Sequence, residues 1–378
     1  MSLYWNVSRY EPEEGIELVH YYLAYGLMIM AGVKTLTGYT ENRKSKKKYY
    51  CIIWASTWII LLGLRHPSMG VDLQYGSTLG YLGQFQIIRN LNWKQILNWS
   101  GHYEMGYVIF NKLLGYLSDN YQILLMMSAV ISIGITARWI YINSDYPVLS
   151  SVIYLGLPCF MMNFSGIRQM IAITITLHAY EMIRKRNFRY FLLFVFLAWT
   201  FHRSAWIFVI AYPLYWIKMG KKMRTVSIAI PLITYVFRYP LFQMLSRLFK
   251  EDAQMDYNNA ITLFLVFWAV YAFTVLFSKE NGRDENGWRN LFLLACVCQS
   301  FAGVYSTAMR IGYYFMPYIA VLLPKIIANT KLEHGNYKRE SELIMYLMIF
   351  VCFMAFGLHS IANGSWAMSN PHMFFWQG

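Results

Sequence analysis

The sequence predicts an all-α integral membrane protein that forms a single polytopic domain over residues 1–378. Of the 378 residues, 57% are hydrophobic and only 14% are charged, whereas soluble domains carry about 25% charged residues. The mean hydropathy is positive, at +0.34. Apolar runs of about 15 to 22 residues recur along the whole chain, which is typical of membrane-spanning helices. Together these features favour about twelve transmembrane helices.

The first two predicted spans set the orientation of the chain. An apolar run from Ile16 to Leu36 separates an acidic stretch, residues 11–14, from the basic run Arg43 to Lys48. Because Lys and Arg are enriched in cytoplasmic loops, the N-terminus is expected outside and the basic run inside. A second span, Tyr49 to Leu64, then returns outward. The remaining predicted spans are Tyr121 to Ile142, Val148 to Phe164, Ile167 to Ile183, Tyr190 to Thr200, Ala205 to Ile217, Val226 to Phe237, Ala260 to Phe277, Trp288 to Gly303, Ile311 to Ala328 and Leu343 to Ile361.

Two longer stretches are predicted to stay on the outer side. Residues 65–120 contain no convincing apolar run, but His102 to Leu117 alternates apolar and polar positions at helical spacing. That pattern predicts an interfacial or re-entrant helix, since a crossing here would move the later basic loops to the other side. The second stretch, Arg238 to Asn259, is predicted as an outer loop with acidic residues at 251, 252 and 256. Both termini are then expected outside.

The placement of positive charge excludes nucleic acid as a partner. The formal charge is +14, and an excess of this kind can indicate a surface that binds nucleic acid. On the predicted topology, however, roughly two thirds of the 33 Lys and Arg residues lie in short inner clusters between apolar runs. The cations left outside are mostly single arginines at helix ends, which need anionic partners: Arg65, Arg168, Arg203, Arg238 and Arg310.

Several other kinds of site are not supported by the sequence. The five cysteines lie in or next to apolar runs, which disfavours a disulfide or zinc site. The chain has no nucleotide-binding glycine pattern, no HExxH or GxSxG motif and no DxD triplet. No basic region precedes the first apolar run, so a cleavable signal peptide is not expected. We therefore expect neither a metal nor a cofactor.

Two outer carboxylates are candidate proton acceptors. Asp72 follows Arg65 in a loop that contains Gly70. A guanidinium matches phosphate oxygens and a carboxylate can take a hydroxyl proton, although an Arg65–Asp72 ion pair that only fixes the loop is an equal alternative. Glu104 begins the interfacial helix, where it is either a catalytic carboxylate or an acidic residue favoured by the helix dipole.

Two further motifs lie at the outer ends of spans. Arg168 and Gln169 open a helix, where backbone N–H groups favour an anion and Arg168 can add bidentate bonds to a diphosphate. The alternative for Arg168 is an arginine that reaches to lipid headgroups. His202, in an outer turn, either relays a proton or binds a phosphate, or is simply solvated.

A last motif begins at Arg310, which opens a later span in the same way. Tyr313 and Tyr314 follow it. Their rings are either sugar-stacking platforms or anchors in the aromatic belt of the membrane.

In their order and spacing these motifs resemble the EpsG-type family of bacterial membrane proteins, within the broader Wzy-like polysaccharide polymerases. Each motif is short, and the combination across residues 65–314 carries the resemblance. The matching segments are Arg65 to Tyr75, Glu104 to Tyr107, Ser165 to Gln169, Phe201 to Ala205 and Arg310 to Tyr314.

The resemblance implies a glycosyltransferase with a GT-C-like fold that polymerises O-antigen, capsule or exopolysaccharide. Such enzymes join undecaprenyl-diphosphate-linked repeat units on the outer face of the bacterial cytoplasmic membrane. We expect an inverting transfer with Asp72 or Glu104 as base and His202 as an assisting or alternative base. The predicted substrate-binding residues are Arg65, Arg168, Gln169, Arg310 and Tyr314, and their permanent charges would replace a metal ion.

The expected partners are the lipid-linked donor and acceptor oligosaccharides and the lipid bilayer, and the sequence leaves a chain-length regulator open. Two other functions stay as alternatives. A transporter or flippase for the same lipids would place cations along a pathway at the bilayer midplane. A ligase that moves the glycan to another acceptor has nearly the same electrostatic demands as a polymerase.

Overall fold

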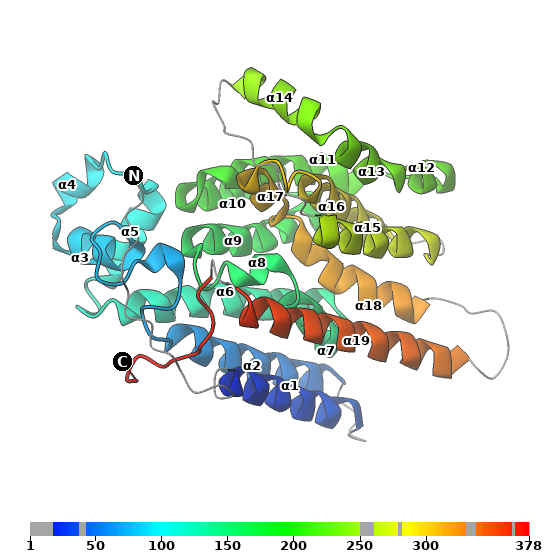
Figure 1. The fold of residues 1–378 in the computed structure, drawn as a ribbon, viewed down its shortest axis with the longest axis horizontal. Coiled ribbons are helices and arrows are strands. Elements are labelled where there is room, and N and C mark those ends of the chain that lie inside the picture. Colours follow the sequence, from blue (N-terminus) through cyan, green and yellow to red (C-terminus); the bar gives the residue numbers. More distant parts are fainter. Residues whose placement is uncertain are drawn as a thin grey trace.

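The computed structural model of the chain describes residues 18–37, 43–249, 261–278, 282–329, 338–364 and 367–377. All secondary-structure elements in these ranges are helices, which confirms the predicted all-α class. Most of the long helices run roughly parallel or antiparallel to one another along the long axis of the molecule (Figure 1).

The helices follow one another along the described parts of the chain. In order they are α1 (Val19–Thr37), α2 (Arg43–Gly63), η1 (Val71–Leu73), α3 (Tyr81–Asn90), α4 (Trp93–Leu97), α5 (Met105–Leu114), α6 (Gln122–Asn143), α7 (Pro147–Leu155), α8 (Pro158–Met161), α9 (Ile167–Arg184), α10 (Phe188–Phe201), η2 (Arg203–Ile210), α11 (Ala211–Trp216), α12 (Lys221–Val226), α13 (Ala229–Val236), α14 (Arg238–Phe249), α15 (Ile261–Leu276), α16 (Arg283–Gln299), α17 (Ser306–Gly312), η3 (Met316–Tyr318), α18 (Ile319–Asn329) and α19 (Lys338–Ala362).

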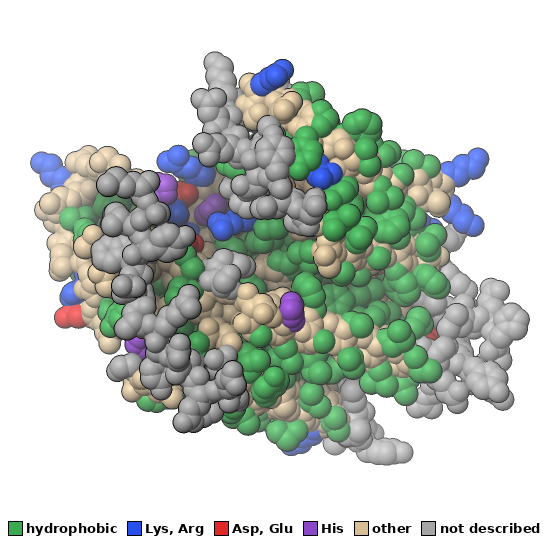
Figure 2. Space-filling view, viewed as in Figure 1, with side chains coloured by type: hydrophobic (Ala, Val, Ile, Leu, Met, Phe, Trp, Pro, Cys, Tyr) green, Lys and Arg blue, Asp and Glu red, His purple; other side chains and the backbone are tan. Residues whose placement is uncertain are grey.

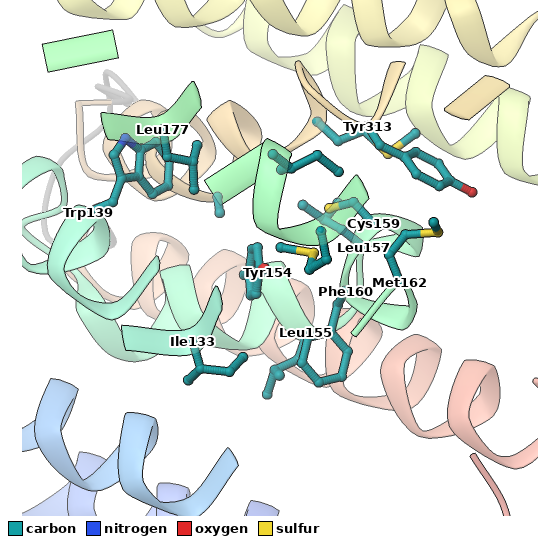
Figure 3. Close-up of a cluster of buried hydrophobic side chains, with 14 of the residues drawn as sticks. Ile133, Trp139, Tyr154, Leu155, Leu157, Cys159, Phe160, Met162, Leu177 and Tyr313 are labelled. Atoms are coloured by element: carbon teal, nitrogen blue, oxygen red, sulfur yellow. The ribbon is translucent and has the colours of Figure 1, made fainter. Parts of the chain in front are cut away.

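Helix α7 and the turn after it lie at the centre of the bundle. Every residue of α7 is buried, including Ser150 and Ser151, whose hydroxyls are hydrogen-bonded. Helices α2, α6, α18 and α19 pack against it. Figure 3 shows Tyr154, Leu155 and Phe160 of this region among side chains of neighbouring helices. The turn leads directly into α9, so the start of α9 is fixed by the core.

The predicted span Val148 to Phe164 is broken in the structure. Pro158 is the first residue of α8, and Leu157 before it has extended backbone angles. A residue before proline avoids the helical region, and proline has no N–H to continue the helix. The chain therefore leaves α7 after Leu155 and forms only the short helix α8 before α9 begins.

Two described helices are long and apolar enough to cross a membrane by themselves. They are Gln122–Asn143 and Glu342–Ala362. The helices Lys221–Val236 and Arg238–Arg247, bent by 75°, make a third if they form one span. These helices support a membrane protein, whereas the count of about twelve spans stays a prediction.

The predicted outer loop Arg238 to Asn259 is partly wrong, because Arg238–Phe249 forms helix α14. Its apolar residues recur at helical spacing, and Phe242 is buried against Phe301 and Val304. Residues 250–259, with the acidic residues of that prediction, lie outside the described residues, as do residues 11–14.

The predicted outer motifs lie at one end of the bundle. Helices α3, α4 and α5 gather there, beside the C-terminal end of the chain (Figure 1). The C-terminal segment pairs with the end of α2: His66 N–H donates to the Met373 oxygen at 2.7 Å and Phe375 N–H to the Leu64 oxygen at 2.9 Å. This end carries the candidate site.

Candidate active site

The starts of α5 and α9 meet in an ion pair. Glu104 is the N-cap of α5 and Arg168 is the second residue of α9, and Arg168 Nη1 donates to Glu104 Oε2. Their side chains are only 13% and 11% exposed. Because little water reaches the pair, removing one partner would leave an uncompensated buried charge. Two residues singled out from separate motifs are thus in direct contact.

Two tyrosines that the motif analysis did not single out surround Arg168. The Cζ atom of Arg168 lies 4.5 Å from the ring centre of Tyr103 and 5.6 Å from that of Tyr81, and Arg168 Nε donates to the Tyr81 hydroxyl at 3.3 Å. Burial raises the pKa of Tyr81; Arg168 opposes this effect, and Asp72 and Glu104 add to it. The Arg168 guanidinium therefore lies against the ring faces of both tyrosines, and the tyrosine hydroxyls stay protonated.

Glu104 also ties α5 to the end of α10. Its Oε1 accepts a hydrogen bond from the backbone N–H of Arg203 at 3.1 Å. Gly106, two residues later, lies against Thr200, and a Cβ at Gly106 would overlap the Thr200 side chain and oxygen. The glycine of this motif is therefore needed for the close approach of the two helices. Glu104 thereby fixes the backbone at Arg203, whose own side chain is exposed.

His202 lies between α10 and η2 in a chain of hydrogen bonds. Its Nδ1 lies 2.7 Å from Ser204 Oγ and accepts from Ser204 N–H at 3.4 Å, while Ser204 Oγ lies 3.0 Å from the Tyr314 hydroxyl. Burial lowers the pKa of His202 to about 4; Glu104 opposes the shift and Arg168 and Arg310 add to it. His202 is therefore neutral at neutral pH, with Nδ1 as an acceptor and the ring proton on Nε2.

Tyr314 supports this arrangement from inside the protein. It is fully buried, at 0% exposure, and Tyr313 is 2% exposed. Neither ring faces the outside, so the structure places them neither as sugar-stacking platforms nor as aromatic-belt anchors. The hydroxyl of Tyr314 positions Ser204 instead, and through it His202.

Gln169 brings the start of α9 to α17. Its Nε2 donates to the backbone oxygen of Arg310 at 2.9 Å, and Gln169 itself is 2% exposed. The guanidinium of Arg310 is half-buried and makes no hydrogen bond or ion pair to the described residues, and its charge acts on His202. Arg310 is thus a cation of this site that remains available to an anionic ligand.

Arg65 is placed differently from the other predicted cations. It is 1% exposed, and its guanidinium donates to the backbone oxygens of Leu62 at 2.6 Å, Phe164 at 3.0 Å and Met69 at 3.3 Å. Burial lowers its pKa to about 10, so it stays protonated. These contacts make Arg65 the link between the end of α2 and the turn before α9, and it forms no ion pair with Asp72.

The same turn positions Asp72. Gly70 has a φ of +125°, and a Cβ there would overlap the Phe164 oxygen. Two residues later, Asp72 N–H donates to Ser165 Oγ at 3.1 Å. The Asp72 carboxylate has no hydrogen bond or ion pair to the part of the chain that the structure describes, while its charge acts on Tyr81 and Tyr103. It is a partly exposed carboxylate beside the Arg168 cluster.

The arrangement provides the elements for transfer of a group from a diphosphate. Figure 2 shows Lys and Arg, His and Asp and Glu side chains gathered between the α3–α5 region and the rest of a largely hydrophobic face. Arg310 and Arg203 can neutralise an anion, and Asp72 can accept a proton. No group of three or more metal-ligating His, Cys, Asp or Glu side chains occurs among the described residues.

Sequence reasoning missed Tyr81 and Ser204, and it named Arg203 only as an outer arginine that needs an anionic partner, without a role in the site. Ser204 and Arg203 lie inside a motif that was singled out for His202, so the signal was present in the sequence. Tyr81 lies on another helix, α3, and nothing in its neighbourhood links it to Arg168 before the chain is folded.

The comparison with protein families is consistent with this geometry. The model described as "EpsG family" matches residues 47–372, which is most of the chain and includes every residue of the site. No curated protein and no solved structure matches the chain. The match indicates a polysaccharide-polymerase-like, glycosyltransferase-type function in a membrane protein of polysaccharide biosynthesis.

Proposed function

Because the chain belongs to the EpsG family, we propose that it polymerises undecaprenyl-diphosphate-linked oligosaccharide repeat units by glycosyl transfer. The observation that carries this proposal is the convergence of Arg168, Glu104, His202 and Arg310 at one end of the bundle. The guanidinium of Arg310, which has no hydrogen bond or ion pair to the described residues, suits a reaction whose leaving group is a diphosphate.

The proposed reaction is an inverting transfer between two lipid-linked glycans. The acceptor hydroxyl oxygen attacks the anomeric carbon of the donor, the bond from that carbon to the diphosphate oxygen breaks, and the lipid diphosphate leaves with the electron pair. The hydroxyl proton passes to a carboxylate. Of the two candidates, Asp72 is favoured as base, because Glu104 is held in the ion pair with Arg168 and by Arg203 N–H.

The other side chains have supporting roles in this proposal. Arg310 and Arg203 bind the diphosphate, and Arg168, fixed by Glu104, adds to the positive field. His202 donates its Nε2 hydrogen to a substrate oxygen rather than acting as the main base, since its acceptor nitrogen Nδ1 is already engaged by Ser204. Arg65 holds the turn that positions Asp72. No divalent metal is required, because permanently charged arginines neutralise the leaving group.

An apolar groove beside the site suits the lipid chain of such a substrate. It has a volume of about 380 Å³ and is lined by side chains of α10 and η2: Leu192, Val195, Phe196, Trp199, Trp206 and Val209. Trp199 and Trp206 flank His202 in sequence, so the groove ends next to the polar cluster. An isoprenoid chain in the groove would place its diphosphate near Arg203.

The proposal includes the outer face of the bacterial cytoplasmic membrane as the location. It also includes about twelve spans in a GT-C-like arrangement. The supporting observation is the distribution of charge, because the motifs lie at the end of the bundle opposite the basic loops. A chain-length regulator is an optional partner in this proposal, and the polymer is an O-antigen, capsule or exopolysaccharide.

The test is incubation of the purified protein with one synthetic lipid-diphosphate repeat unit and no other acceptor. A ladder of lengthening glycans is expected from the unchanged protein. Arg310→Gln should reduce ladder formation by about 10²–10³, whereas Arg247→Gln, an exposed arginine on α14, should not. No ladder from a folded protein that binds the substrate would contradict a polymerase and favour a ligase or transporter.

A further inference from the structure

A cavity of about 1080 Å³ lies at the opposite end of the bundle from the candidate active site. It is formed by the end of α11, the start of α12, the end of α15 and the start of α16. Its volume is slightly above the range for ligand pockets, about 300–1,000 Å³. Its position excludes it from the proposed polymerisation chemistry.

The described lining of this cavity is positively charged. Lys218, Lys221, Arg224 and Arg283 line it, and no carboxylate does so among the described residues. None of these four side chains forms an ion pair with another described residue. Like charges gathered from three segments repel one another, so an anion in the cavity would stabilise the arrangement.

The two described carboxylates at the start of α16 each have a partner outside the four cations of the lining. Asp284 Oδ2 pairs with Arg184 at 3.0 Å, and its other oxygen accepts from the Tyr215 hydroxyl. Glu285 pairs with Lys325 at 3.1 Å. Neither carboxylate forms an ion pair with the four cations of the cavity lining.

A buried arginine next to the cavity adds to its positive charge. Arg289 is 1% exposed, and its Nε and Nη2 find no hydrogen-bond partner among the described residues. The charge of Arg224, in the cavity lining, and the opposite charge of Glu285 both act on Arg289. Two guanidinium donors without a partner among the described residues can hydrogen-bond an anionic group that enters this region.

The cavity also has an apolar side. Trp216 forms part of its lining, and the guanidiniums of Arg186 and Arg283 stack on its ring at 4.4 Å and 4.9 Å. Leu276 lines the cavity and is 65% exposed, so the apolar side continues onto the outer surface of the helices. A ligand that fits both parts carries an anionic group and a hydrocarbon chain.

We propose that this cavity binds the phosphate headgroup of an anionic phospholipid from the membrane leaflet at this end of the protein. Basic pockets between membrane helices are suited to such headgroups. The four cations would hold the phosphate oxygens, and the acyl chains would follow Leu276 along the helix surface. The ligand chemistry, a phosphate, is shared with free inorganic phosphate, and the hydrocarbon contacts favour the lipid.

The test uses the full-length protein in zwitterionic phosphatidylcholine nanodiscs, with lipid retention measured by native mass spectrometry. Phosphatidylglycerol is added in one series and inorganic phosphate in another. Retention of phosphatidylglycerol in preference to phosphatidylcholine is expected. Tighter binding of inorganic phosphate than of phosphatidylglycerol, or equal retention of both lipids, would overturn the proposal.

Two double variants with the same loss of charge separate the cavity from the general basic surface. Lys218→Gln with Lys221→Gln removes two exposed cations of the lining, and Lys44→Gln with Lys48→Gln removes two exposed cations of α2. The cavity variant should bind phosphatidylglycerol about 25-fold more weakly, at about fivefold per cation. Equal affinity in the two variants would overturn the proposal, and the single variant Lys218→Glu gives a second reading if the double variant does not fold.

Discussion

The side-chain amide of Gln169 donates a hydrogen bond to the backbone oxygen of Arg310 at 2.9 Å, across 141 positions of sequence. Arg168, the neighbour of Gln169, forms the ion pair with Glu104. The first turn of α9 therefore contacts both the start of α5 and the backbone of α17 at Arg310. The geometry of Arg310 therefore depends on α9 as well as on its own helix.

Replacing Gln169 by Leu should remove this connection. The Arg310 oxygen would lose a buried partner, at a cost of about 1–3 kcal/mol in unfolding free energy, and the polymerisation rate per folded molecule should fall about tenfold. Asn290→Leu is a matched control, since Asn290 donates to the oxygens of Leu214 and Ile217 at 2.8 Å away from the site. The control should lose similar stability in a thermal unfolding assay and keep its activity; equal activity losses would contradict the connection.

The ion pair between Glu104 and Arg168 predicts strong coupling between the two residues. Glu104→Gln leaves Arg168 charged and partly buried, and Arg168→Gln does the same to Glu104, so each single variant should be more than tenfold less active. The double variant should be at least as active as the less active single variant, because it leaves neither charge unpaired. A double-mutant cycle on unfolding free energy should give a coupling of at least about 1 kcal/mol. Additive effects would mean that the two side chains act independently.

The low pKa of His202 predicts a loss of stability in acid. Burial lowers its pKa to about 4, below the value of about 6.5 for an exposed histidine. The unfolded chain then binds a proton more readily than the folded one, so this contribution to stability is complete above pH 6.5 and is lost as the pH falls to about 4. Burial also lowers the pKa of His372 to about 4, so both residues contribute in this window.

A His202→Gln variant should flatten this dependence. The melting temperature of the unchanged protein should fall more steeply between pH 6.5 and 4 than that of the variant, and His372→Gln should remove a separate part of the slope. Identical slopes in the unchanged protein and the His202 variant would contradict the assigned burial.

The gathering of the charged candidate residues at one end of the bundle could be predicted from the sequence, because charge in an apolar chain is rare. Arg168, Glu104, His202 and Arg310 were each singled out at helix ends, and the structure brings them to one end of the bundle. The reason is physical. Each helix connects the two ends of the bundle, so successive turns alternate between these ends, and basic turns at one end leave the polar turns with the candidate residues at the other.

The contact partners of individual side chains and the interruptions of helices could not be predicted in the same way. Arg65 satisfies three backbone oxygens, and Tyr81 stacks near Arg168; both contacts depend on distances between segments that are far apart in sequence. Hydropathy also overestimated the regularity of the helices. Pro158 interrupts one predicted span. Part of a predicted loop forms helix α14, which buries Phe242 against the rest of the protein.

Gly70 should be intolerant of any side chain. Its φ of +125° is unfavourable for other residues, and a Cβ would overlap the Phe164 oxygen that Arg65 also contacts. Gly70→Ala should therefore move Asp72 away from Ser165 and reduce polymerisation more than about 100-fold. Gly76→Ala is the control, because Gly76 also has a positive φ, of +81°, with no atom within 4 Å of the added Cβ. The control isolates backbone strain of about 1 kcal/mol, and similar losses in both variants would rule out the steric explanation.

Asp72 should affect the rate of transfer more than the binding of substrate. Asp72→Asn keeps the shape and the backbone bond to Ser165 but cannot take a proton, so kcat should fall by about 10²–10⁴ with KM changed less than threefold. Asp119→Asn is a matched control at the same end of the bundle, where Asp119 is 84% exposed and pairs with Arg89, and it should keep full activity. Glu104→Gln should instead raise KM as well as lower kcat, because Glu104 fixes Arg168 and the backbone at Arg203. If Asp72→Asn keeps its kcat and Glu104→Gln loses kcat alone, the proton acceptor is Glu104 and the roles of the two carboxylates are reversed.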